Sequence, residues 1–98
     1  MSMPGGFGAA REPTADEIEI LAALQDQIEE KLGKTFGSAF KAVQFTTQVV
    51  AGTNYLFKVE VDAGYLHVKV HKPLPHTGNP PVLLDASEGH ELNTPLSP

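Results

Sequence analysis

The sequence contains no cysteine among its 98 residues, so it can form neither a disulfide nor a thiolate metal site. Its stability must therefore come from packing alone, and this composition favours a reducing compartment. The N-terminus lacks both a basic start and an apolar run of signal-peptide length, and no later run is long and apolar enough to span a bilayer. We expect a cytoplasmic protein.

Basic residues are also few, because seven lysines and arginines stand against twelve aspartates and glutamates, giving a net charge of −5. Binding to nucleic acid or to an anionic membrane needs clustered Lys and Arg, so neither is an expected partner. The hydrophobic content of 41% is ordinary for a globular protein. A chain of this length can hold one core, and we expect a single domain over residues 1–98.

Motifs for catalysis and for metal binding are missing as well. There is no cysteine nucleophile and no Gly-x-Ser-x-Gly, so an enzyme is not expected. The glycines near the N-terminus do not match a phosphate-binding loop, and no cofactor is expected. His67 and His71 lie four residues apart on an expected strand, a separation of about 13 Å, which is too long for one metal ion. We therefore expect both histidines to face solvent and expect no metal site.

The N-terminal third of the chain contains a flexible arm and a helix. Residues 1–13 are rich in glycine and proline, which predicts a flexible N-terminal arm. Thr14 and Glu17 have the spacing of a capping box, and Gly33 suits a left-handed helix end, so a helix is predicted over 14–33. One face of this helix is apolar and is expected to be buried, and it comprises Ile18, Leu21, Leu24, Ile28 and Leu32.

Over residues 40–85 the apolar period changes to two, which predicts an antiparallel sheet. Strands are expected around 43–49, 55–61 and 66–70, with a turn at 62–64. The proline-rich stretch 73–81 must be a loop, after which Val82-Leu83-Leu84 is expected to add a short last strand before a C-terminal segment, 86–98. The fold class is α+β, with an antiparallel β-sheet of four to five strands wrapped across one α-helix.

The tip of the first expected hairpin, Gln48-Val49-Val50-Ala51-Gly52, is apolar. Turns normally face water and select Asn, Asp, Gly or Ser, so an apolar tip indicates a surface that another protein covers. In an up-down meander the first and third connections lie at the same end of the sheet, and the helix brings its N-terminus close to that end. We therefore expect the arm, this tip and the loop at Leu74-Pro75-His76 to form one edge.

Several stretches of the chain resemble the stefin branch of the cystatins. These are the tip with its flanks Lys41-Ala42-Val43-Gln44 and Thr53-Asn54-Tyr55, together with Pro4-Gly5-Gly6, the helix segment 27–32 and Leu74-Pro75-His76. The resemblance covers most of the chain and implies a cystatin-like fold. It also implies reversible, noncovalent inhibition of papain-like cysteine proteases, such as papain and the lysosomal cathepsins, by a wedge that enters the active-site cleft.

The resemblance also implies which residues contact the protease. Met3 and Pro4 would lie in the non-primed subsites, while the two hairpin loops would cover the primed side. The residues implied in protease binding are Met3, Pro4, Gly5, Gly6, Gln48, Val49, Val50, Ala51, Gly52, Leu74, Pro75 and His76.

The C-terminal part departs from the stefin pattern, since the segment after Leu84 is shorter and Pro95 and Pro98 replace a terminal aromatic stretch. An alternative interpretation is therefore a binding or assembly module that keeps the fold with weakened or lost inhibition. The tip also lacks Asn-Gly, so the hairpin could straighten and exchange strands with a second copy. A monomer is the first expectation and a domain-swapped dimer is the alternative.

Overall fold

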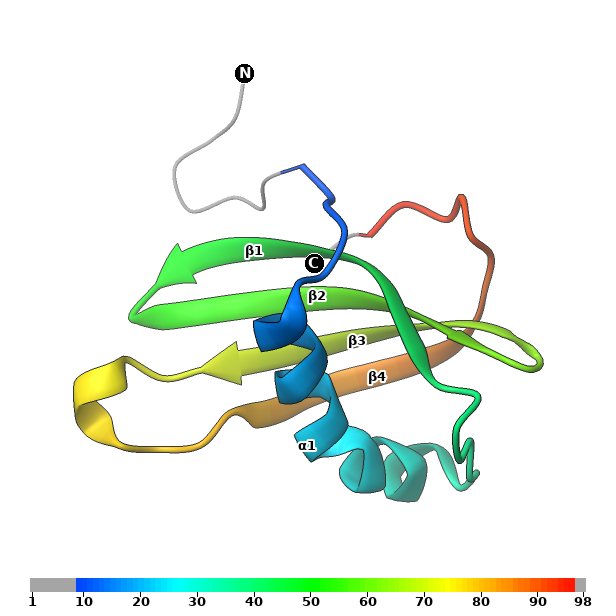
Figure 1. The fold of residues 1–98 in the computed structure, drawn as a ribbon, viewed down its shortest axis with the longest axis horizontal. Coiled ribbons are helices and arrows are strands. Elements are labelled where there is room, and N and C mark those ends of the chain that lie inside the picture. Colours follow the sequence, from blue (N-terminus) through cyan, green and yellow to red (C-terminus); the bar gives the residue numbers. More distant parts are fainter. Residues whose placement is uncertain (1–8, 97–98) are drawn as a thin grey trace.

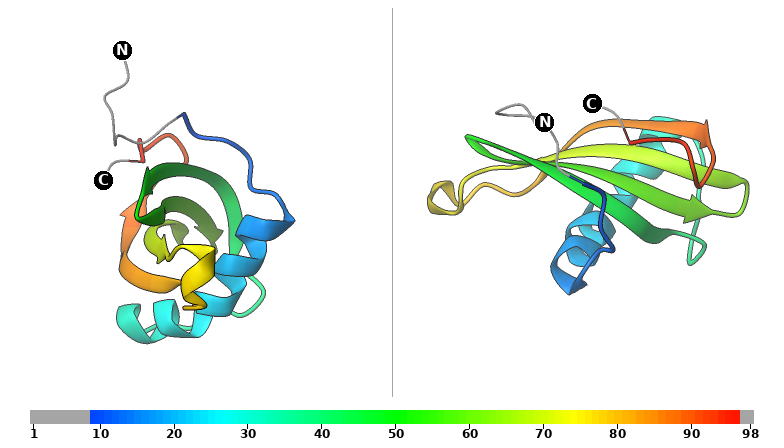
Figure 2. Two further views of the ribbon diagram at one scale, coloured as in Figure 1. Left: turned by 90° about the vertical axis from the view of Figure 1, so that its left-hand side faces the viewer. Right: turned by 90° about the horizontal axis from the view of Figure 1, so that it is seen from above.

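A computed structural model describes residues 9–96 as one helix packed across a four-stranded antiparallel sheet (Figure 1). The helix is α1 (Ala15–Leu32), and the strands, in sheet order, are β1 (Lys41–Val50), β2 (Gly52–Val61), β3 (Gly64–Lys72) and β4 (Val82–His90). Each strand pairs with the next in sequence, and the sheet curls around the helix (Figure 2). The α+β class expected from the sequence is confirmed.

Helix α1 begins and ends where the sequence indicates. The Glu17 carboxylate accepts a 2.8 Å hydrogen bond from the Thr14 backbone N–H, closing the capping box, and Gly33 ends the helix at φ +69°. The buried face differs from the predicted one in its first turn, because Ile18 is 50% exposed while Ile20 is buried. Ile18 lies about 100° around the helix from the middle of the buried stripe, so it faces water.

The core lies between α1 and the facing side of the sheet. Its fully buried members on β2 and β3 are Phe57, Val59, Leu66, Val68 and Val70. Strand β1 has a register shift between Ala42 and Gln44, so Ala42 packs against the core in place of Val43. The strict alternation expected from Val43 onwards is therefore wrong at that residue.

Strand β4 is longer than the sequence suggested. It extends to His90, so residues 86–90 belong to the sheet instead of to a C-terminal segment. Only Ala86 of this strand is buried, because β4 is an edge strand, and the side chains around Ala86 in its second half are polar and give little apolar alternation. The strand is therefore identified by its backbone pairing with β3 and not by a hydrophobic pattern.

The chain after β4 folds back over the sheet face that is remote from α1. The Lys58 ammonium donates to the backbone carbonyls of Leu92 and Thr94, and Lys58 is only 1% exposed beneath this segment. Burial lowers the pKa of Lys58.

His67 lies on the same face and does not simply face solvent, as the sequence had suggested. Its ring stacks on His90 with centroids 3.7 Å apart, and its buried Nε2 has no hydrogen-bond partner within residues 9–96. Burial, with smaller contributions from His90 and Lys58, lowers the pKa of His67 to about 4.

The described part of the N-terminal arm is paired with the sheet. Arg11 and Phe45 exchange two backbone hydrogen bonds of 2.8 and 2.9 Å as an antiparallel bridge, and the Arg11 guanidinium lies 4.7 Å from the Phe45 ring centroid. The expectation of a flexible arm over residues 1–13 is therefore wrong at Arg11. Arg11 contacts both the Phe45 ring and the backbone of β1, and the glycine-rich composition of the arm gives no sign of these contacts.

Candidate functional site

Two of the three expected segments lie at one end of the sheet. The β1–β2 tip and the connection between β3 and β4, which contains the short 3₁₀ helix η1 (Pro75–Thr77), are both at the left in Figure 1. This placement follows from the antiparallel meander, in which the first and third connections share an end. We refer to residues 48–52 and 74–76 together as the loop edge.

The loop edge exposes apolar side chains. Val49 is 77% exposed, Val50 43% and Leu74 38%, and Ala51, Pro75 and His76 are also exposed. Exposed apolar residues clustered on two neighbouring loops are typical of a surface that a partner covers. The sequence of both loops contains no Asp or Glu, so no carboxylate would have to be buried when the loop edge is covered.

Gly52 permits the tip to approach the end of β3. It has φ +112°, and a Cβ atom placed on it would lie 2.4 Å from the Lys72 carbonyl oxygen and 3.1 Å from Pro73 Cα. Both the backbone conformation and the space therefore require glycine at this position. The consequence is that the tip packs directly on the chain that leads into the second loop.

A row of polar side chains crosses three strands behind the tip. Asn54 Nδ2 donates to Gln48 Oε1 at 3.1 Å, and Asn54 Oδ1 lies 2.7 Å from His71 Nδ1. Gln48 pairs with Asn54 in the β1–β2 register, and Asn54 pairs with His71 in the β2–β3 register. Neither Asn54 nor His71 was expected in the site from the sequence. The sequence does hold a signal for them in its first two turns, centred on Ala51 and on Asp62-Ala63. These turns set the β1–β2 and β2–β3 registers, which place Asn54 beside Gln48 and His71 beside Asn54.

Local hydrogen bonds order the second loop. The Leu74 carbonyl accepts from the Thr77 backbone N–H at 3.0 Å and from the Thr77 hydroxyl at 2.7 Å. Gly78, at φ +69°, donates to the Pro75 carbonyl at 3.2 Å. These bonds and the fixed φ of proline limit the conformations of Leu74, Pro75 and His76. The loop expected over 73–81 is confirmed, with one short helical turn within it.

The remaining candidate residues, Met3, Pro4, Gly5 and Gly6, lie outside the described residues. What the structure describes of the arm is its direction at Arg11, which pairs antiparallel with Phe45 and donates to Thr47 Oγ1 at 3.4 Å. Because the pairing is antiparallel, Ala9 and Ala10, which precede Arg11, are directed towards the part of β1 that leads to the tip.

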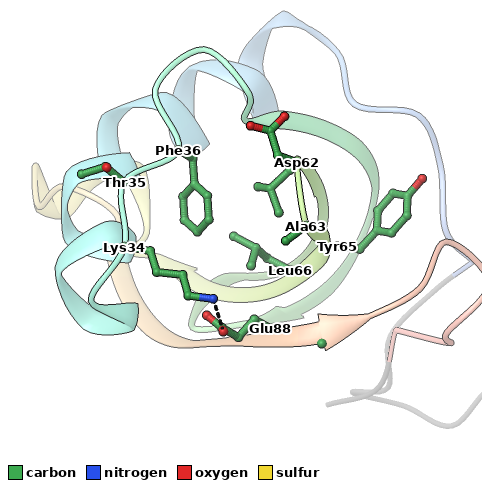
Figure 3. Close-up of a pocket in the computed structure, with 10 residues that line it drawn as sticks. Lys34, Thr35, Phe36, Asp62, Ala63, Tyr65, Leu66 and Glu88 are labelled. Carbon is green, nitrogen blue, oxygen red and sulfur yellow. Dashed lines mark hydrogen bonds and ion pairs between the residues drawn. The ribbon is translucent and has the colours of Figure 1, made fainter.

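A hollow of about 320 Å³ lies at the opposite end of the sheet (Figure 3). Phe36 and Leu66 line it, and the Lys34–Glu88 ion pair, 2.7 Å long, crosses its rim. The loop edge, in contrast, projects from the molecule and holds no acid–base pair beside a nucleophile. Its chemistry is therefore that of apolar contact and shape.

Among residues 9–96 no three His, Cys, Asp or Glu side chains are grouped so that they could hold a metal ion. Within residues 9–96, neither α1 nor the short η1 has the length and apolar character needed to cross a membrane.

Comparison with known proteins identifies relatives over most of the chain. A model of the cystatin domain matches residues 9–90. Cystatin-A1 of Sus scrofa is 46% identical over 79 residues, covering 80% of this chain and 76% of the relative. Cystatin-B of Macaca fuscata fuscata is 45% identical over 96 residues, covering 97% of each chain. Cystatin-A of Homo sapiens is 47% identical over 74 residues, covering 74% of each.

Proposed function

Because the chain belongs to the cystatin family, as a homologue of its stefins, which implies cysteine protease inhibition, we propose that it inhibits papain-like proteases reversibly and noncovalently. In this proposal the loop edge is a wedge that fills the active-site cleft of papain or a lysosomal cathepsin. The observation that carries the proposal is the convergence of two exposed apolar loops at one end of the sheet. Members of this family are protease inhibitors and not enzymes.

The wedge works by filling the cleft without presenting a cleavable bond. Val49, Val50 and Leu74 supply apolar area, while the backbone at the tip is held in a turn that keeps peptide carbonyls out of attack geometry. A partner interface of ordinary size, about 1,600 Å², is compatible with nanomolar binding, near −12 kcal/mol. A preformed edge also lowers the entropy cost of ordering the loops on binding.

The N-terminal arm completes the proposed wedge. Met3 and Pro4 would occupy the non-primed subsites, and Gly5-Gly6 would let the chain bend away from the catalytic thiolate. The direction of the chain at Arg11, towards the tip end of β1, supports this placement. Removing Met1 to Gly5 should therefore weaken inhibition while leaving the Arg11–Phe45 bridge in place.

The test is a titration of active-site-titrated papain with the purified chain. We expect stoichiometric loss of activity that returns on dilution and displacement by substrate, with intact inhibitor recovered afterwards. Failure to inhibit at micromolar concentration, or recovery of a cleaved chain with kinetics of a substrate, would refute the proposal.

We propose that the active form is a cytoplasmic monomer. The alternative is an assembly module in which the first hairpin straightens and exchanges strands. The sequence of the tip is the observation that favours considering it, because the first hairpin turns at Ala51 without the Asn-Gly pair that suits a two-residue turn. Size-exclusion chromatography with a papain assay on each fraction separates the two, since exchange would hide the tip in an inactive dimer.

A further inference from the structure

The Gln48–Asn54–His71 row has a defined direction. Asn54 Nδ2 donates to Gln48 Oε1, so the atom that Asn54 presents to His71 at 2.7 Å is a carbonyl oxygen, which can only accept. His71 must therefore carry a proton on Nδ1. Neutral imidazole satisfies this as its Nδ1–H tautomer, and imidazolium satisfies it as well, so the contact forms in both protonation states.

The strands on either side of His71 place no charged residue opposite it. Asn54 on β2 and Val82 on β4, which pair with His71 in the two registers, carry no charge. The contact therefore depends on the donor at Nδ1 and not on an ion pair with a register partner.

The row ends at both halves of the loop edge. Gln48 is the first residue of the tip, and His71 is followed by Lys72, whose carbonyl lies against Gly52. His71 Cε1 itself would lie 3.1 Å from a Cβ on Gly52, so the ring is in contact with the tip. The row and the glycine contact together attach the tip to the strand that leads into the second loop.

We propose that Asn54 and His71 are positioning residues that hold the two loops of the loop edge as one rigid unit. The proposal rests on the proposed protease inhibition for its functional consequence. Its structural content, the direction of the hydrogen bonds, can be tested without a protease.

Nitrogen-15 NMR of the uniformly labelled chain tests the direction of the row. The ring signals of His71 should show the Nδ1–H tautomer of the neutral imidazole. Finding the Nε2–H tautomer at neutral pH would reverse the direction of the row and overturn the proposal.

Two substitutions test the functional consequence against papain. His71→Phe keeps a ring beside Gly52 and removes the donor, so we expect the inhibition constant at pH 7.5 to rise about five-fold. His71→Asn keeps a donor at the δ position, so it should recover most of that loss.

His90→Asn, which removes a histidine at the other end of the sheet, is the matched control and should inhibit like the wild type. If the wild-type chain inhibits and His71→Phe inhibits equally well, the positioning role is wrong. If the wild-type chain does not inhibit, the proposed function fails while the NMR result still decides the direction of the row.

Discussion

The two ends of the sheet are built from tight turns of opposite character. At one end, which we call the turn end (residues 61–64), Asp62 and Ala63 are exposed and carry no large apolar side chain. At the loop edge, Val49 and Val50 directly precede the turn at Ala51 and are exposed. Polar residues suit a solvated turn, so turn stability alone favours the composition found at the turn end. The difference supports the proposal that a partner covers the loop edge.

The two ends also differ in what supports them. The turn end borders the hollow lined by Phe36 and Leu66, which the Lys34–Glu88 ion pair crosses at its rim (Figure 3). The loop edge has Gly52 against the Lys72 carbonyl and the Gln48–Asn54–His71 row behind it. Substitutions matched between the two ends therefore separate effects on folding from effects on binding.

The largest expected effect comes from Gly52→Ala compared with Gly64→Ala. Both glycines have positive φ, so each substitution costs about 1–2 kcal/mol in backbone strain. At Gly52 the new Cβ would also meet the Lys72 carbonyl at 2.4 Å, whereas at Gly64 its nearest contact is 3.4 Å from the His90 carbonyl. We expect about 3 kcal/mol of destabilisation at Gly52 by urea unfolding.

Inhibition should separate the same pair. Gly52→Ala should weaken inhibition of papain at least 100-fold because the tip must move, and Gly64→Ala should leave it unchanged under conditions where both are folded. Equal inhibition by the two variants would show that the Gly52 contact does not shape the binding surface.

The next effect is on binding alone. Val49→Asp places a charge in the proposed interface and should weaken papain inhibition about 100-fold. Because Val49 is 77% exposed, the melting temperature should barely change. Ala63→Asp, the same charge at the turn end, is the control and should inhibit like the wild type. A comparable loss from Ala63→Asp would mean that the turn end also contacts the protease.

Acid should destabilise the fold through His67, on the sheet face remote from α1. The pKa of folded His67 is about 4, below the ordinary 6.5, so the unfolded chain takes up a proton that the folded chain refuses. Stability should therefore fall as the pH drops from about 6.5 to about 4 and then level off with respect to this group. Allowing for partial solvent exposure, we expect a loss on the order of 1–2 kcal/mol in urea unfolding. His67→Asn should show a shallower decline over the same interval, and an identical decline would contradict the assignment.

The smallest effect is expected at Lys58. Lys58→Met removes the ammonium that binds the carbonyls of Leu92 and Thr94, and should cost about 1–2 kcal/mol. Hydrogen exchange should show the loss concentrated in residues 91–96, while papain inhibition stays close to that of the wild type. Uniform loss of protection across the sheet would mean that Lys58 supports the core and not the terminal segment.

The sequence predicted those features that arise from periodicity and turn chemistry. The capping box at Thr14, the helix end at Gly33 and the first two turns follow from local patterns, and they set the registers that bring the loops together. The extension of β4 to His90 could not be predicted, since only Ala86 of that strand is buried. The shift at Ala42 and the burial of His67 beside Lys58 depend on contacts between strands, which no local pattern records.

The most direct test of the central claim is an NMR footprint of the chain bound to papain whose active-site thiol has been blocked by a small group. If the two apolar loops form one binding surface, backbone signals of residues 48–52 and 74–76 should shift or broaden together, while those of Asp62 and Ala63 stay in place. A footprint centred on the turn end, or one that includes only one of the two loops, would contradict the account.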